Sequence, residues 1–140
     1  MILFCDTSAL VKLYIVEVGS DELKARVLEA EAVAVCRIAW AEAYAAFSRR
    51  AREVPEDAMF IEQAKAALAA DWPHFVALDI DQSLVERAGE YADTFALRGY
   101  DSIQLAAAFE AGRVSQSAIL FACFDMRLNK AARLLGMQCL

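Results

Sequence analysis

The chain has 140 residues, 59% of them apolar and 24% charged, and its formal net charge at pH 7 is −6. This length predicts a single domain over residues 1–140, large enough to bury about two-thirds of its unfolded surface. No apolar run approaches the roughly 20 residues of a membrane span, and Asp6 interrupts the apolar N-terminal segment, so we expect a cytoplasmic protein with no signal peptide and no membrane contact.

Short apolar runs alternate with longer helical patterns along the whole chain, as is typical of an α/β protein. These runs predict buried strands, the last of them at an edge: Ile2–Cys5, Ala32–Cys36, Phe75–Leu78, Ser117–Phe124 and Gln138–Leu140. Because the runs are apolar throughout, the sheet should be parallel and covered by helices on both faces. The sequence therefore predicts a three-layer α/β/α fold with a central parallel sheet.

Helical patterns fill the intervals between the strands. We expect helices that begin at caps on Ser8 and Ser20, followed by helices over Ile38–Arg52, Pro55–Asp71, Asp81–Tyr91, Asp101–Glu110 and Met126–Leu135. Gly112 and Gly136 follow the last two segments and are expected to end them.

The cysteines and the histidine predict neither a zinc site nor a disulfide framework. The cysteines lack a C-x-x-C spacing, and His74 is the single histidine. We expect reduced cysteines that pack as small apolar side chains: Cys5, Cys36, Cys123 and Cys139.

A small set of carboxylates lies within or directly after apolar segments, where charge is costly: Asp6, Glu42, Asp101 and Asp125. Asp6 and Asp125 follow predicted strands. Asp101 opens a predicted helix, and Glu42 lies one turn into another. Because the carboxyl ends of parallel strands meet at one edge of a sheet, these side chains should converge in one crevice. Each also has a simpler interpretation, since the aspartates precede helices and are potential N-caps, and Glu42 could occupy a solvated helix face.

Carboxylates gathered at such an edge repel one another by about 3 kcal/mol per pair at ~5 Å and an effective dielectric constant of about 20. A divalent cation would remove this repulsion, and oxygen-only ligands favour Mg²⁺ or Mn²⁺. Such an ion can activate a water for in-line hydrolysis of a phosphodiester. The sequence has no Gly-rich phosphate loop, so an ATP-driven reaction is not expected.

Two clusters of basic residues could contact nucleic acid despite the acidic net charge. One comprises Arg49, Arg50 and Arg52, and the other Arg127, Lys130 and Arg133. An ordinary solvated helix face is an equally good interpretation of either. We predict that the second cluster contacts phosphates, because it follows Asp125 closely.

The segments around the acids match a known pattern: Asp6-Thr7-Ser8-Ala9-Leu10, the lone Glu42, Tyr100-Asp101-Ser102-Ile103-Gln104-Leu105-Ala106-Ala107-Ala108, and Phe124-Asp125-Met126-Arg127-Leu128-Asn129-Lys130-Ala131-Ala132 before Gly136. In these segments, and over its whole length, the chain resembles the PIN domain, and more closely the VapC toxins of bacterial toxin–antitoxin pairs. The first and third segments are the most specific.

The resemblance implies a Mg²⁺-dependent endoribonuclease that hydrolyses RNA with a metal-activated water, forms a homodimer and is inhibited by a cognate antitoxin protein. It implies that the catalytic and metal-binding residues are Asp6, Glu42, Asp101 and Asp125. Cys123 departs from the family, which often has Thr or Ser two residues before the last acid. A thiol is the weaker hydrogen-bond partner, so this departure bears on activity level and metal preference.

Two other functions fit part of the pattern. A phosphoacceptor signalling module on a similar sheet would use Asp79, but such modules need an acidic pair after the first strand, and here Thr7 and Ser8 follow Asp6. A catalytically idle PIN-like binding module would keep the fold without the activity, although the acids are all present.

Overall fold

The computed structural model describes every residue from Met1 to Leu140. Its centre is a five-stranded sheet with the strand order β3-β2-β1-β4-β5. The strands are β1 (Ile2–Cys5), β2 (Ala32–Cys36), β3 (Val76–Leu78), β4 (Ile119–Ala122) and β5 (Gln138–Cys139). All neighbouring strands run parallel, as predicted, and β1 occupies the middle of the sheet.

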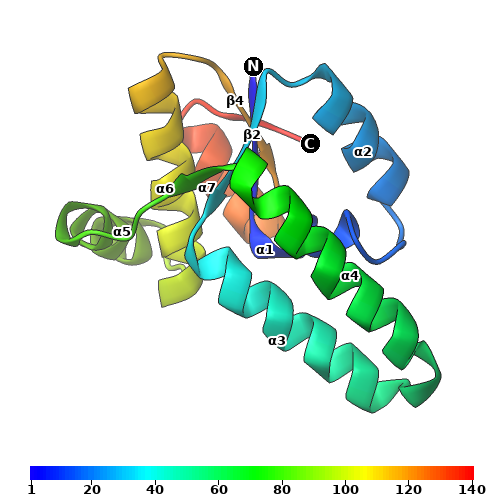
Figure 1. The fold of residues 1–140 in the computed structure, drawn as a ribbon. Helices are drawn as coiled ribbons and strands as arrows, with labels where there is room; N and C mark the ends of the chain where they lie inside the picture. The colour runs from blue at the N-terminus through cyan, green and yellow to red at the C-terminus, as the bar shows by residue number, and fades with distance from the viewer.

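Helices cover both faces of this sheet. They are α1 (Thr7–Lys12), α2 (Ser20–Glu29), α3 (Ile38–Glu53), α4 (Ala58–Asp71), α5 (Gln82–Phe95), α6 (Gly99–Ser115) and α7 (Met126–Leu134), with short 3-10 helices η1 (Pro55–Asp57) and η2 (Trp72–His74). Helices α1 to α4 pack on one face and α5 to α7 on the other (Figure 1). The predicted three-layer α/β/α architecture is therefore confirmed. None of the helices combines the length and the apolar character needed to cross a bilayer.

Strand side chains divide between two apolar cores. On β1, Ile2 and Phe4 pack with α5, α6 and α7, whereas Leu3 and Cys5 pack with α1 to α4. This alternation is the two-residue period of a strand, and burial on both faces explains why the strands are apolar throughout. The unpaired cysteines predicted from the sequence are confirmed, and three of them are buried: Cys5, Cys36 and Cys123.

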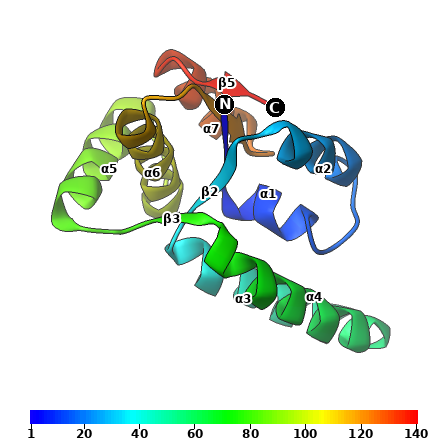
Figure 2. The same cartoon turned by 45° about the horizontal axis from the view of Figure 1, so that its top comes forward.

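The strand order places the carboxyl ends of β2, β1 and β4 next to one another. Asp6 directly follows β1, and its N–H donates to the carbonyl of Ala122, the last residue of β4, over 3.1 Å. Helices α1 and α3 start at the edge where β1 and β2 end (Figure 2). Any side chain in the first turns of these helices is thereby carried to one edge of the sheet.

The caps of the first two helices differ from the prediction. Asp6, rather than Ser8, caps α1, because its side chain reaches the N–H of Ala9. Ser8 lies inside the first turn and donates its hydroxyl to Asp6. Gly19 stands at the N-cap of α2, and Ser20 lies inside that helix.

Other helix and strand boundaries also differ from the prediction. Helix α6 begins before Asp101 and continues through Gly112 to Ser115, so Gly112 does not end it. A Cβ at Gly112 would lie 3.0 Å from Cγ1 of Ile119, so this glycine instead permits close packing of α6 against β4. Strand β4 ends before Phe124, because the Phe124 N–H bonds to a hydroxyl outside the sheet.

Candidate active site

Asp6 connects β1 to α1 at the carboxyl edge of the sheet. Its Oδ1 accepts hydrogen bonds from the Ala9 N–H over 2.9 Å and from the Ser8 hydroxyl over 2.7 Å. Asp6 is only 6% exposed, and no ion pair of the chain includes it. Asp6 is thus a helix cap, but also a buried carboxylate without a cationic partner.

The pKa of the Asp6 carboxyl is raised above its ordinary value, chiefly because burial removes its hydration. The carboxylate of Asp101 raises this pKa further, while hydrogen bonds from Cys123, Ser8 and Ala9 lower it. Asp101 belongs to α6, which packs against β1. Burial of one carboxylate beside another is a feature of functional sites.

Cys123 lies between Asp6 and Asp125, at the position where the family often has a hydroxyl. Burial and the charge of Asp6 raise the pKa of its thiol, so the thiol remains protonated at neutral pH. Its sulfur accepts the N–H of Asp125 over 3.3 Å, and it donates to the carbonyl oxygen of the same residue over 3.9 Å. The thiol therefore contacts the backbone of Asp125 at the position where a hydroxyl would otherwise stand.

Glu42 is held by two donors from different elements. Thr7 Oγ1 donates to Glu42 Oε1 over 2.8 Å, and Gln104 Nε2 donates to the same oxygen over 3.0 Å. Gln104 Nε2 also lies 3.0 Å from Thr7 Oγ1. These bonds exclude the interpretation of Glu42 as a freely solvated side chain, and they leave Oε2 available.

Gln104 is a site residue that the sequence analysis missed. It is buried on α6, and its Oε1 has no hydrogen-bond partner in the protein. Its bond to Glu42 joins residues 62 positions apart. The available signal was a polar residue within the apolar segment after Asp101, and this segment was interpreted only as a family motif.

Asp101 and Asp125 stand on the other side of the site. Asp101 lies in the first turn of α6, with its side chain 35% exposed and Arg98 Nε 3.5 Å away. Asp125 caps α7 and accepts the Leu128 N–H over 3.0 Å. The interpretation of the aspartates as N-caps is therefore correct for Asp6 and Asp125 and wrong for Asp101.

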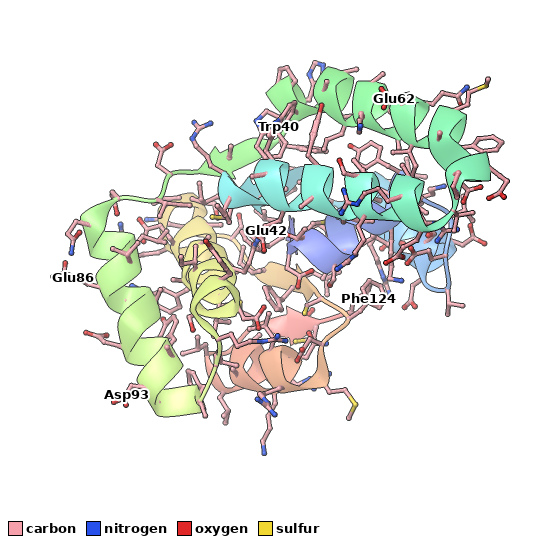
Figure 3. The ribbon with its side chains drawn as sticks, turned by 90° about the horizontal axis from the view of Figure 1, so that it is seen from below. Trp40, Glu42, Glu62, Glu86, Asp93 and Phe124 are labelled. Carbon is pink, nitrogen blue, oxygen red and sulfur yellow. The ribbon has the colours of Figure 1, made fainter.

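Two cavities open at this edge, and Phe124 lines both. The first, of about 530 Å³, contains Thr7 and Glu42. The second, of about 480 Å³, contains Asp101 and Asp125. Figure 3, viewed from below, shows Glu42 and Phe124 on the same face of the molecule. Glu42 thus lines one cavity and Asp101 and Asp125 the other, whereas the buried Asp6 lines neither.

The donor atoms at this edge are carboxylate oxygens, which suit Mg²⁺ or Mn²⁺. No group of three or more His, Cys, Asp or Glu side chains is placed to hold a metal ion by itself. Structural zinc sites use complete sets of protein ligands, whereas Mg²⁺ keeps several waters and binds through one or two carboxylates. The residues therefore fit Mg²⁺ or Mn²⁺ better than zinc, and ligation by all the predicted acids stays a prediction.

The predicted basic cluster on α7 lies partly at the site. Arg127 lines the second cavity, beside Asp125. Lys130 and Arg133 are exposed on the same helix and line neither cavity. Only the first member of this cluster therefore stands next to the acids, and contact with RNA stays a prediction for all three.

Other basic side chains also line the two cavities. Arg49, from the first basic cluster, lines the Glu42 cavity together with Lys12. Arg50 pairs with Asp57 over 3.1 Å and lies elsewhere. Arg98 lines the second cavity. Lys12 and Arg98 were not predicted from the sequence, because neither belongs to a run of basic residues.

Comparisons with known proteins identify the family of this chain and support its fold. Residues 3–134 match the model of the PIN domain family. Ribonuclease VapC45 of Mycobacterium tuberculosis (strain CDC 1551 / Oshkosh) is 32% identical over 139 residues, covering 96% of this chain and 92% of that protein. VapBC2 from Rickettsia felis, bound to a DNA fragment from their promoter, has a similar fold, with a TM-score of 0.67, 13% identity and coverage of 100% of this chain and 98% of that chain. A toxin–antitoxin complex from Klebsiella pneumoniae has a TM-score of 0.63 and 18% identity, with coverage of 92% of this chain and 90% of that chain.

Proposed function

This chain belongs to the PIN domain family, as a relative of the VapC ribonucleases, and from that premise we propose that it is a Mg²⁺-dependent endoribonuclease. Mn²⁺ is the expected substitute for Mg²⁺. The proposed reaction is hydrolysis of RNA phosphodiester bonds by water, and the proposed role is that of the toxin in a toxin–antitoxin pair. The 32% identity to Ribonuclease VapC45 supports this substrate class.

The observation that carries the proposal is the environment of Asp6. This carboxylate is 6% exposed, lacks a cationic partner and is subject to the charge of Asp101 at the edge where parallel α/β sheets bind ligands. Burying a carboxylate next to another is unfavourable in the absence of a compensating charge. A divalent cation bound from solvent would supply that charge.

The side chains have separate roles in this proposal. Asp6 and Asp101 provide negative charge at the end of β1, and Asp125 extends it toward α7. Glu42 is fixed through Oε1, so its free Oε2 is positioned to orient a water or accept a proton from it. When bound, the divalent cation supplies an activated water and neutralises charge on the phosphodiester.

We also propose a cognate antitoxin as inhibitor and a homodimer as the assembled form. The Klebsiella pneumoniae structure of similar fold is a toxin–antitoxin complex. Exposed apolar side chains beside a cavity between the end of α1 and α4, among them Val16 and Phe60, offer a surface for a protein partner. Exposed apolar groups that gather in this way are typical of interaction surfaces.

Cleavage of a labelled RNA by the purified protein tests the proposed activity. We expect cleavage in Mg²⁺, cleavage in Mn²⁺ and none after treatment with a chelator, and no requirement for added zinc. Cleavage that continues unchanged in excess chelator would contradict the role given to the carboxylates. A protein that binds RNA but never cleaves it would be the catalytically idle module.

The geometry does not favour the signalling alternative. Asp79 lies in a separate cavity of about 470 Å³, at the end of β3. Its side chain pairs with Arg37, and the nearby Asp81 is occupied as the cap of α5. Stable phosphorylation of Asp79 by a small phosphodonor would support the signalling function instead.

A further inference from the structure

Phe124 is an apolar side chain placed between the charged groups of the site. It directly precedes Asp125, and the residue is 43% exposed. It is the one residue that lines both the cavity of Glu42 and the cavity of Asp101. A polymer that reaches from one cavity into the other must pass this ring.

The ring is held in place from several directions. Its backbone N–H donates to Ser8 Oγ over 3.2 Å, and the same hydroxyl donates to Asp6. Lys12 Nζ lies 4.6 Å from the ring centroid. A Cβ at Gly19 would lie 2.7 Å from Cε1 of the ring, so this glycine allows the ring to pack against the segment between α1 and α2. The orientation of the ring is therefore fixed, while part of its surface stays exposed.

Basic side chains stand on both sides of the ring. Lys12 and Arg49 line the cavity on one side. Arg98 and Arg127 line the cavity on the other. Carboxylates line the same cavities, and Lys12 and Arg98 pair with Glu17 and Asp101. An exposed aromatic ring flanked by basic side chains is an arrangement with which proteins hold single strands of nucleic acid, because phosphates bind the cations and bases stack on the ring.

We propose that Phe124 is the platform on which one unpaired base of the RNA substrate stacks while the flanking phosphates enter the two cavities. The inference rests on the proposed ribonuclease function and adds a substrate-positioning residue to it. A base inside a duplex is already stacked on its neighbours and is not free to reach the ring. Phe124 would therefore favour single-stranded segments over duplex.

Tyr100 provides a matched control. It directly precedes Asp101, as Phe124 precedes Asp125, and it is 63% exposed. It lines neither cavity. The variants are Phe124→Leu, Phe124→Trp and Tyr100→Leu, each made in a background of Asp101→Asn so that the RNA stays intact during binding.

The measurement is the binding of short single-stranded RNAs that carry the fluorescent base 2-aminopurine at one position each. We expect a position at which binding changes the fluorescence in the Asp101→Asn background. Phe124→Leu should abolish that change and weaken binding about tenfold or more. Phe124→Trp should retain both, and Tyr100→Leu should leave both unchanged. Binding of the corresponding duplex should be insensitive to Phe124→Leu.

The outcomes separate this inference from the proposed function. If the wild-type protein cleaves RNA but Phe124→Leu keeps the affinity and the fluorescence change, the stacking role is wrong and the nuclease proposal stands. If the wild-type protein neither binds nor cleaves any RNA, both fail. A fall in melting temperature for Phe124→Leu would point to a packing role for the ring. In that case the Phe124→Trp variant is the deciding test. Loss of the fluorescence change in a folded Phe124→Trp protein would overturn the inference.

Discussion

The buried amide of Gln104 on α6 donates a hydrogen bond to Oε1 of Glu42 on α3, over 3.0 Å. These helices lie on opposite faces of the sheet, so the bond ties the two layers together at the carboxyl edge. It also gives Glu42 a fixed orientation, which a flexible glutamate side chain would otherwise lack.

Replacing Gln104 with leucine should lower the rate of RNA cleavage more than it lowers stability. Glu42 would lose one of its two donors, and small misplacements of a catalytic group can reduce rates about 100-fold. The stability loss should be below the roughly 1.5–3 kcal/mol of a hydrogen bond to a charged group, because the unpaired Oε1 of Gln104 is removed as well. Initial rates and melting temperatures, compared with Thr7→Ser as a control that keeps the hydroxyl donor, test this. Full activity in both Gln104→Leu and Thr7→Val would show that Glu42 needs no positioning.

Replacing Asp6 with asparagine should stabilise the metal-free protein near neutral pH. The folded-state pKa of Asp6 is raised, so its contribution to stability is present below the unfolded pKa and is lost as the pH rises through the folded pKa. Asparagine removes the buried charge and keeps an oxygen that can accept the Ala9 N–H. Melting in chelator from about pH 4 to about pH 8 should show a gap between variant and wild type that widens as the pH rises. A variant that is equally destabilised at every pH would mean that Asp6 matters only as a cap.

Mg²⁺ should raise the melting temperature of the wild-type protein. The cation binds the folded cluster of acids and not the dispersed acids of the unfolded chain, which gives about 2.7 kcal/mol at 100 times the dissociation constant. Asp101→Asn should reduce this gain, whereas Asp93→Asn on the outer surface of α5 should leave it intact. No change in melting temperature at millimolar Mg²⁺ would count against a shared cation site.

Neutralising Arg127 should weaken RNA binding for all sequences and flatten its dependence on salt by about one phosphate contact. Arg127 lines the cavity of Asp101, whereas Lys130 lies farther along α7. Arg127→Gln should therefore have the larger effect, and a Lys130→Gln variant serves as its comparison. Equal salt slopes for the wild type and the Arg127→Gln, Lys130→Gln double variant would identify α7 as an ordinary solvated face and direct attention to Arg49.

The fold was predictable from the sequence where the pattern of apolar residues reports which faces of a strand or helix are buried. Strands buried on both faces are apolar at every position, so Ile2–Cys5 and Ala32–Cys36 were predicted with their observed bounds. Helix ends were harder to predict. A glycine such as Gly112 often ends a helix. Here the helix continues through it, and the glycine serves close packing against Ile119, a contact that exists only in the folded chain.

The candidate site was predictable where its residues follow strands. The topology carries Asp6 and Asp125 to the carboxyl edge, and their placement needs only strand order. The positions of Gln104, Lys12 and Phe124 around these acids depend on contacts between distant segments, such as the bond of Phe124 to Ser8 across 116 residues. No local pattern marks such contacts, so these residues emerge only from the structure.

The most direct test of the central claim is the initial rate of RNA cleavage by Asp101→Asn in saturating Mg²⁺, measured beside the wild type and with the melting temperature of both. Asp101 is partly exposed and caps no helix, and its ion pair with the exposed Arg98 is of the kind that contributes little to stability, so asparagine should leave the fold intact. We predict a folded variant with cleavage reduced to the background seen in chelator. Cleavage at the wild-type rate by a folded Asp101→Asn protein would contradict the assignment of this edge of the sheet as a metal-dependent nuclease site.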